Sequence, residues 1–335
     1  MRNARFAAAA AAALVLGITV TGCTSDANPS DAAGTNDTTT EGKTVAIVTA
    51  GSNSPYYTAL RCGAERSAKD FGFTVQFQGT PSTEPREEMT VFNSVVATDP
   101  DAMVLIPWDS EAFVAPAQAF ADSGKLILTA DGVLNEKVDL QNISTNGDDA
   151  GSEVAQQLID DGLTGTVLIV THSPGNVVQM ARTTGFRATL EAAGIDVLET
   201  QYAGSDASKA ASIVSGAITG NPDLSLVFTT MDTIGQGSAS AIAADGKEDD
   251  IKLIGYDADP AAVTALKEGK YAGIISQSPD FMGFESIQTI GKVMSGEVDA
   301  DSLEYNVDSP VMYITADNVD TPEAAPFLYT GECSE

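Results

Sequence analysis

The chain repeats one unit, in which a short apolar strand ends in a polar turn and a helix follows. In the first copy, the apolar run 45–48 breaks at Gly51 and Asn53, and Pro55 suits the first turn of the helix that follows. Apolar runs and helical patterns alternate in this way along most of the remaining chain. This alternation predicts an α/β fold made of doubly wound parallel sheets, with the turns at the carboxyl edge of each sheet.

Two series of such elements follow one another. The first has expected strands at 45–48, 73–78, 101–107 and 126–129, helices at 56–70, at 84–98 and from about 110 to 123, and a crossover segment at 140–144. The second opens with a helix at 146 and has expected strands at 166–171, 196–202, 224–229, 251–256 and 272–276, with helices at 177–193, 208–219, 233–244 and 260–268. A last helix at 281–294 and extended runs at 303–307 and 311–314 suit a chain that crosses between two domains again at its end.

Length and charge limit the possible functions. A chain of 335 residues is too long for one compact core and predicts two domains and a tail. The formal net charge is -30, with only 17 Lys and Arg residues. No nucleic-acid partner is expected, because phosphate binding needs a basic surface.

The N-terminus has the pattern of an export signal. Arg2 and Arg5 precede an apolar stretch at 6–20 that is too short and wrongly flanked for a stable membrane span. The stretch ends in Val-Thr-Gly-Cys at 20–23, which resembles the bacterial lipobox. We therefore expect a signal peptide at 1–22, a lipid on Cys23, and a flexible tether at 23–42 that is rich in Ser, Thr, Asp, Asn and Gly.

The two remaining cysteines are Cys62 and Cys333. If the signal is real they lie outside the cytoplasm, where disulfides persist. Their separation has no zinc-ligand spacing. A bridge is the preferred prediction, and two free thiols are the alternative.

Catalysis has little support in the sequence. His172 is the only histidine, and neither a Gly-x-Ser-x-Gly elbow nor a phosphate-binding Walker loop is found. The Gly-Gln-Gly at 235–237 lies inside an expected helix and lacks the third glycine of the dinucleotide fingerprint. We expect no enzymatic activity, no cofactor and no metal site.

Polar or aromatic residues follow the expected strands one after another. Since carboxyl ends of parallel strands share an edge, these residues are expected to face one crevice between two sheets. Carboxylates and amides can hold adjacent hydroxyls, and aromatic rings can cover the apolar face of a sugar, so a neutral polyhydroxyl ligand is predicted. The residues are Asn53, Ser54, Tyr56, Tyr57, Trp108, Asp109, Asp131, His172, Met231, Asp232, Asp257 and Gln277.

Four segments together resemble the type I periplasmic sugar-binding proteins that supply ABC importers, in particular those similar to ribose-binding protein. They are Asn-Ser-Pro-Tyr-Tyr at 53–57, Ile-Pro-Trp-Asp-Ser at 106–110, Ile-Gly-Tyr-Asp at 254–257 and Ser-Gln-Ser-Pro at 276–279. The resemblance covers about 43–314. It implies two α/β domains joined by a three-crossing hinge, with the ligand held between them.

The resemblance also assigns ligand contacts. They fall on Ser54 or Asn53, Tyr56, Tyr57, Asp131, Arg182, Asp257 and Gln277. Three departures separate this chain from the family pattern: Gly132 replaces an arginine, Met231 replaces an asparagine, and no aromatic residue lies near Ser205. Only the ligand class is therefore carried over, and the particular sugar or polyol stays open. Two residues keep an alternative role, His172 as a capping or core residue and Arg182 as a helix-surface charge.

The expected organisation and function follow from these features. One domain comprises 43–145 and 278–308, and the other comprises 146–277 and 309–335 with the tail. We expect a monomeric lipoprotein on the outer face of the cell membrane that delivers its ligand to an ABC transporter permease. A sensor that presents its ligand to a membrane receptor or kinase is the first alternative, and a sugar-modifying enzyme the second. A transcriptional regulator of similar fold is excluded by the export signal and by the lack of a helix-turn-helix before Lys43.

Overall fold

A computed structural model describes residues 39–333 of the chain. The expected signal peptide and Cys23 lie outside these residues, as does most of the expected tether. At the start of the described part, the Gly42 amide donates a 3.0 Å hydrogen bond to the Gly72 carbonyl. Within 39–333, no helix is long and apolar enough to cross a membrane.

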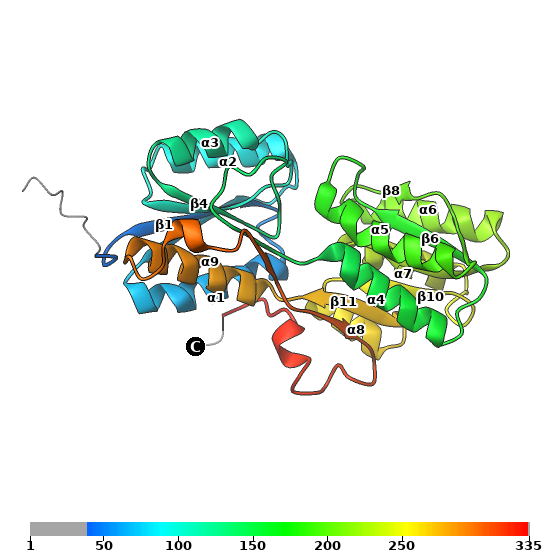
Figure 1. The fold of residues 1–335 in the computed structure, drawn as a ribbon. Coiled ribbons are helices and arrows are strands. Elements are labelled where there is room, and N and C mark those ends of the chain that lie inside the picture. The colour runs from blue at the N-terminus through cyan, green and yellow to red at the C-terminus, as the bar shows by residue number, and fades with distance from the viewer. Residues whose placement is uncertain (1–38, 334–335) are drawn as a thin grey trace, which may run out of the picture. The chain divides into compact units, whose positions relative to one another are not determined.

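The first lobe is a parallel sheet in the order β12-β5-β4-β3-β1-β2. Its strands are β1 (Thr44–Ala50), β2 (Thr74–Thr80), β3 (Ala102–Ile106), β4 (Leu126–Ala130), β5 (Asn142–Ser144) and β12 (Asn306–Asp308). Its helices are α1 (Pro55–Phe71), α2 (Pro85–Val96), α3 (Val114–Asp122) and α9 (Pro279–Met294), and a 3-10 turn, η1 (Ala300–Ser302), precedes β12. Figure 1 shows α2 and α3 on one face of the sheet and α1 and α9 on the other.

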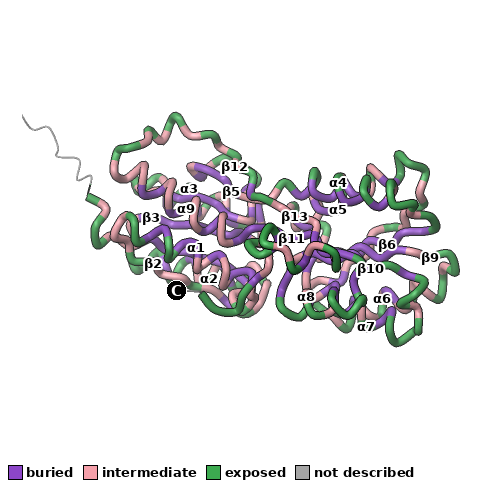
Figure 2. The backbone as a smooth tube through the Cα atoms, turned by 90° about the horizontal axis from the view of Figure 1, so that it is seen from below, coloured by how far each residue is buried: buried purple, intermediate pink, exposed green. Residues whose placement is uncertain are grey.

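Strand periodicity explains this two-sided core. Alternate residues of β1 point to opposite faces, so Val45 and Ile47 pack against α1 and α9. Ala46 and Val48 pack against α2 and α3 instead. A strand buried on both faces must be apolar throughout, which is why these strands read as continuous apolar runs. Figure 2 shows the buried strands between more exposed helices and loops.

The second lobe repeats the construction with a sheet in the order β13-β11-β10-β9-β6-β7, and β8 also pairs with β6. Its strands are β6 (Thr166–Thr171), β7 (Asp196–Val197), β8 (Gln201–Tyr202), β9 (Leu224–Thr229), β10 (Lys252–Tyr256), β11 (Gly273–Gln277) and β13 (Val311–Ile314). Its helices are α4 (Gly147–Asp160), α5 (Val177–Ala192), α6 (Ala207–Gly220), α7 (Asp232–Ala244) and α8 (Pro260–Lys267). The pairing of β13 with β11 is antiparallel, so this sheet is mostly rather than wholly parallel.

Two sequence-based expectations were wrong in detail. Residues 140–144 form no mere crossover, because β5 pairs in parallel with both β4 and β12 inside the first sheet. The expected strand 196–202 is divided into β7 and β8. The Arg187 guanidinium donates to the carbonyls of Val197 and Leu198, at 3.2 and 2.6 Å, where β7 ends, and so satisfies backbone acceptors at this break.

Glycines allow the helices beside the hinge to pack closely. A Cβ added to Gly63 of α1 would lie 1.9 Å from the Asp280 carbonyl oxygen of α9, and one added to Gly283 would lie 1.9 Å from that of Leu60. Figure 1 shows α1 and α9 side by side. This contact holds α9, the helix that follows β11, on the first lobe.

Three connections pass between the sheets, after β5, after β11 and after β12. They lie together, because Ser309 bonds to both of the others. Its amide donates to the Ser144 carbonyl at 2.9 Å, and its hydroxyl donates to the Ser278 carbonyl at 3.3 Å. The fold is therefore two α/β lobes joined by a hydrogen-bonded triple connection.

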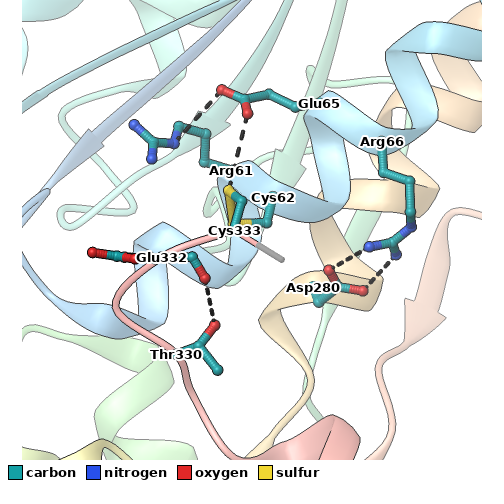
Figure 3. Close-up of a disulfide and its surroundings, with 8 residues drawn as sticks. All are labelled: Arg61, Cys62, Glu65, Arg66, Asp280, Thr330, Glu332 and Cys333. Atoms are coloured by element: carbon teal, nitrogen blue, oxygen red, sulfur yellow. Dashed lines mark hydrogen bonds and ion pairs between the residues drawn. A yellow bond between two sulfur atoms is a disulfide. The ribbon is translucent and has the colours of Figure 1, made fainter. Parts of the chain in front are cut away.

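A tail with a short 3-10 turn, η2 (Ala325–Phe327), follows β13 and ends at a disulfide. The predicted bridge between Cys62 of α1 and Cys333 is present, with a Cα–Cα distance of 5.3 Å (Figure 3). The cysteines are 271 residues apart in the sequence. The bridge therefore closes a loop that contains nearly the whole fold.

We predict that replacing Cys62 and Cys333 with Ser lowers the thermal midpoint of the signal-free protein. The chain-entropy model gives a loop of this length on the order of 5 kcal/mol, because the bridge restricts the unfolded chain. Differential scanning calorimetry of the variant and the wild type measures the difference. An unchanged midpoint would contradict the prediction, as would two reactive thiols in unfolded, unreduced wild-type protein.

Candidate functional site

The carboxyl edges of both sheets enclose a cavity of about 550 Å³. The cavity lies beyond the carboxyl ends of the strands, which is where ligands bind in open α/β sheets. Most of the sequence-predicted residues line it: Asn53, Ser54, Tyr56, Tyr57, Trp108, Asp131, Arg182, Met231, Asp232, Asp257 and Gln277. They come from both lobes, so neither lobe forms the cavity alone.

Two predicted residues lie outside the cavity lining. The Asp109 carboxylate accepts hydrogen bonds from the amides of Glu111 and Ala112, at 3.0 and 2.9 Å, so it stabilises the turn before α3. His172 is not among the lining residues, but its ring lies 5.6 Å from that of Trp108 in an edge-on arrangement. Burial lowers the pKa of His172, and therefore favours a neutral ring at this position.

The sequence analysis missed several lining residues: Gly51, Pro55, Pro81, Ser82, Thr83, Gln179, Ser205 and Thr233. Gln179 precedes Arg182 by one helical turn on α5, so helical spacing could have identified it. Thr83 and Ser205 belong to loops of different lobes. Their hydroxyls share a 3.0 Å hydrogen bond between the lobes, a contact that no local sequence pattern predicts.

The turn after β1 places two tyrosines on the cavity wall. The Ser54 hydroxyl caps α1 by accepting a hydrogen bond from the Tyr56 amide at 3.2 Å, and Pro55 begins the helix. Gly51 has a φ of 66°, a left-handed conformation that favours glycine. This turn brings the Tyr57 hydroxyl to Asp131, where it donates to Oδ2 at 3.2 Å.

Asp131 and Asp257 occupy equivalent positions in the two lobes. Each follows a central strand, β4 or β10, and donates its amide to the neighbouring strand, at 3.0 Å to Ile143 and 2.9 Å to Ile275. Each also has a left-handed backbone, with φ of 57° and 71°. Such a conformation costs a non-glycine residue on the order of 1 kcal/mol or more, and is found where function requires a particular side-chain direction.

Arg182 lies between these two carboxylates and is 3 % exposed. Its Nη2 is 3.8 Å from Asp131 Oδ1, and its Nη1 is 3.8 Å from Asp257 Oδ2. Nη1 also donates to the Thr230 carbonyl at 2.7 Å, and the guanidinium lies 4.1 Å from the centre of the Tyr256 ring. This residue is thus a buried cation at the centre of the cavity wall, and not the helix-surface charge of the alternative interpretation.

The carboxylates are strongly affected by their burial. Burial raises the pKa of Asp257 to about 7, although Arg182 and the amide of Gln277 oppose the shift. Burial likewise raises the pKa of Asp131, with Arg182 again opposing it, and that of Asp232. Three acidic groups around one arginine disfavour an anionic ligand and leave several hydrogen-bond acceptors for a neutral one.

Residues lining the cavity leave four buried polar atoms without a hydrogen-bond partner in the described chain. They are Asp131 Oδ1, Trp108 Nε1, Thr233 Oγ1 and Gln277 Oε1. Buried polar groups are normally paired, so hydrogen bonding in the wall of the cavity is incomplete within the described chain.

The three departures from the family pattern have structural correlates. A Cβ at Gly132 would lie 2.5 Å from the Pro107 carbonyl oxygen, so no arginine fits here without a backbone shift. Met231 is buried to 7 % exposure and packs on the core while lining the cavity. Ser205, near which the family pattern has an aromatic residue, shares a hydrogen bond with Thr83 of the other lobe.

The described residues also contain no group of three or more His, Cys, Asp or Glu side chains arranged to hold a metal ion. Carboxylates, amides, hydroxyls, one arginine and aromatic rings line the cavity. Such groups can form hydrogen bonds with a ligand and stack on its rings.

Comparison with known proteins agrees with this architecture. Residues 45–297 match the family model of the periplasmic binding protein domain. The ribose import binding protein RbsB of Salmonella typhimurium is 26% identical over 259 residues, which cover 76% of this chain and 86% of the relative. The fructose import binding protein FruE of Bifidobacterium longum is 24% identical over 327 residues, covering 92% and 96%.

Solved structures give the same result. A solute-binding protein of an ABC transporter from Agrobacterium vitis, bound with alpha-D-tagatopyranose, superposes with a TM-score of 0.80 at 28% identity, covering 86% of this chain and 99% of that one. A carbohydrate transporter solute-binding protein from Agrobacterium radiobacter, in complex with D-arabinose, has a TM-score of 0.78 at 28% identity with the same coverage. The matched region is more than half of the chain, which therefore belongs to the periplasmic binding protein family, in its type I sugar-binding branch.

Proposed function

We propose that this chain captures a sugar or polyol in the cavity between its lobes and delivers it to an ABC importer from the outer face of the cell membrane. The observation that carries the proposal is the convergence of Asp131 and Asp257, from different lobes, on the buried Arg182. A ligand placed against this arrangement contacts both lobes at once.

The chemistry of the cavity favours a neutral polyhydroxyl ligand. Paired carboxylate oxygens can each accept a hydrogen bond from adjacent hydroxyls, and the guanidinium can donate to a hydroxyl or ring oxygen. Tyr56, Tyr57 and Trp108 supply aromatic surface for the apolar face of a ring. Relatives whose names or structures include ribose, fructose, tagatose and arabinose carry such ligands, and we extend that class to this chain.

Binding is proposed to involve closure of the lobes about the three connections near Ser144, Gln277 and Asp308. A ligand shifts such an equilibrium only by its greater affinity for the closed state. The groups from both lobes, Asp131 in the first and Arg182 and Asp257 in the second, would supply that difference. Gln277 ends β11 and hydrogen-bonds Asp257 Oδ1 through its amide at 2.9 Å, so it joins the connection to the site.

We predict that Asp257→Ala weakens sugar binding by at least about 2 kcal/mol, the scale for loss of a buried hydrogen bond to a charged group. A thermal-shift screen of pentoses, hexoses, furanose sugars and polyols first identifies the ligand. Calorimetry then measures affinity, and small-angle scattering measures compaction on binding. Asp161→Ala is the matched control, because Asp161 is an exposed carboxylate at the far end of α4. Unchanged affinity in Asp257→Ala would contradict the role of Asp257 in binding. A wild type that does not become more compact with ligand would contradict closure of the lobes.

Affinity is also predicted to rise with pH. The pKa of Asp257 is raised to about 7 by burial, next to Arg182, Asp131, Asp232 and Gln277. Its ionised form is the better acceptor for ligand hydroxyls, so the protonated form must lose a proton on binding. Between pH 6 and pH 8 the ionised fraction of such a group rises about tenfold, and the affinity should follow. Calorimetry across this range tests it, with Asp257→Asn as the variant that loses the dependence. A wild-type affinity that is flat or falls with pH would refute the assignment.

The proposed anchor is a lipid on Cys23. One acyl chain binds a membrane marginally, so stable anchoring requires more than one. We predict that Cys23→Ala releases soluble protein from the membrane fraction, which cell fractionation and immunoblotting detect. A variant that stays with the membrane would show that the lipid is not the tether.

A further inference from the structure

The last residues of the described chain make contacts that the family comparison does not explain. Residues 315–333 follow β13. Val319, Phe327 and Leu328 pack on the core of the second lobe, and the tail then ends on α1 of the first lobe through Cys333 and Cys62. Figure 3 shows this end of the tail against α1, where the Thr330 hydroxyl donates to the Glu332 carbonyl at 2.8 Å. The tail is therefore a further link between the lobes, in addition to the three connections.

Tyr329 lies between β13 and the disulfide in the sequence, and its polar atoms contact the second lobe. Its hydroxyl donates to Asp257 Oδ1 at 3.2 Å and accepts a hydrogen bond from the backbone amide of Gln277 at 3.1 Å. Its backbone amide donates to the Ala258 carbonyl at 3.0 Å. Two residues earlier in the tail, the Phe327 carbonyl accepts a hydrogen bond from the Ser276 hydroxyl at 2.6 Å.

The ring of the same residue packs on the first lobe. Tyr329 is 4 % exposed and belongs to the core cluster formed with α1 and α9. Its ring lies 5.4 Å from the ring of Tyr56 in an edge-on arrangement. One side chain thus bonds to a proposed ligand carboxylate in one lobe while its ring is fixed in the core of the other.

We propose that Tyr329 is a positioning residue for ligand binding, and that residues 329–333 with the Cys62–Cys333 bridge form a covalent strap that limits how far the cleft opens. The inference rests on the proposed function in one respect, namely that Asp257 is a ligand contact. The strap itself follows from the contacts of the tail.

Length gives the strap its effect. Four residue steps separate Tyr329 from Cys333, and a fully extended chain of that length spans at most about 14 Å. While Tyr329 stays bound to Ala258 and Asp257, Cys62 of α1 cannot move further from Tyr329 than this span plus the 5.3 Å between the Cα atoms of the bridge. A longer segment or an open bridge would remove the limit.

Hydrogen bonding explains the positioning role. The hydroxyl of Tyr329 and the side-chain amide of Gln277 both donate to Oδ1 of Asp257. The other oxygen, Oδ2, lies 3.8 Å from Arg182 Nη1. Two donors on one oxygen fix the carboxylate plane and leave the other oxygen for a ligand. Without the hydroxyl, the carboxylate is held by one donor and its ionised form is less stabilised.

The first test is Tyr329→Phe in the signal-free protein with its disulfide intact. Selective ¹³C labelling of Asp and an NMR titration, assigned with Asp257→Asn, report the pKa of Asp257 without any ligand. We expect the measured pKa to rise by about one in Tyr329→Phe, as loss of a hydrogen bond to a charged group requires. Tyr271→Phe is the matched control, since the hydroxyl of this buried tyrosine has no hydrogen-bond partner in the described chain. An unchanged pKa in Tyr329→Phe overturns the positioning role.

Calorimetry with D-ribose, D-fructose, D-tagatose and D-arabinose gives the functional reading of the same variants. Tyr329→Phe is expected to bind about tenfold more weakly than the wild type and Tyr271→Phe equally well. Equal affinity of Tyr329→Phe and wild type overturns the role in binding. If none of these or the screened sugars binds the wild type, the proposed function fails, and the NMR titration still decides the contact with Asp257.

The strap is tested by giving it slack. A Gly-Ser-Gly-Ser insertion between Thr330 and Gly331 keeps the disulfide and lengthens the link. Small-angle scattering of the ligand-free protein should then give a larger radius of gyration than the wild type, as should Cys62→Ser with Cys333→Ser. A radius of gyration that is unchanged in the folded insertion variant overturns the strap.

Discussion

A buried arginine between two aspartates from different lobes is the interaction on which the rest of the site depends. Taking these charges out of water is costly, and geometry with additional hydrogen bonds must offset the cost. Arg182 is held by the Thr230 carbonyl and the Tyr256 ring, so its position is set by the second lobe alone. Asp131 approaches it from the first lobe at 3.8 Å, which is longer than a hydrogen bond. In the proposed function, a ligand hydroxyl that lies beside this pair and hydrogen-bonds both groups would link the two lobes.

The two lobes prepare this arrangement with the same local device. In each, a central parallel strand ends in an aspartate with a left-handed backbone, and its amide bonds to the neighbouring strand. The strained backbone directs Asp131 and Asp257 toward one another, and apolar strands buried on both faces hold that direction firmly. The apolar cores of both lobes offset the unfavourable free energy of the strained backbone and of the buried carboxyl groups. Asp131 and Asp257 are thus placed by rigid elements of their own lobes, which the proposed closure would bring together.

Sequence reasoning reached the fold and much of the cavity lining because both follow from local pattern. Apolar runs predict strands, parallel strands share a carboxyl edge, and the residues after them therefore meet. It could not reach contacts set by distant parts of the chain. Tyr329 of the tail bonds to Asp257, which is 72 residues away, and Arg187 of α5 bonds to the backbone where the expected strand 196–202 divides. Asp109 has the expected residue type in the expected loop, yet its carboxylate bonds to its own turn and not to the cavity. Composition and spacing contain no record of which way such a side chain points.

Binding of a polyhydroxyl ligand in this cavity is measured most directly by the fluorescence of Trp108. It is the only tryptophan of the chain, it lines the cavity, and its buried indole nitrogen has no partner among the described residues. Titrating the folded, signal-free protein with individual pentoses, hexoses and polyols should give a saturable change in emission for at least one of them. The change should be stoichiometric, with one ligand per chain. Emission that stays constant through the whole series, from protein that is fully folded, would contradict the account.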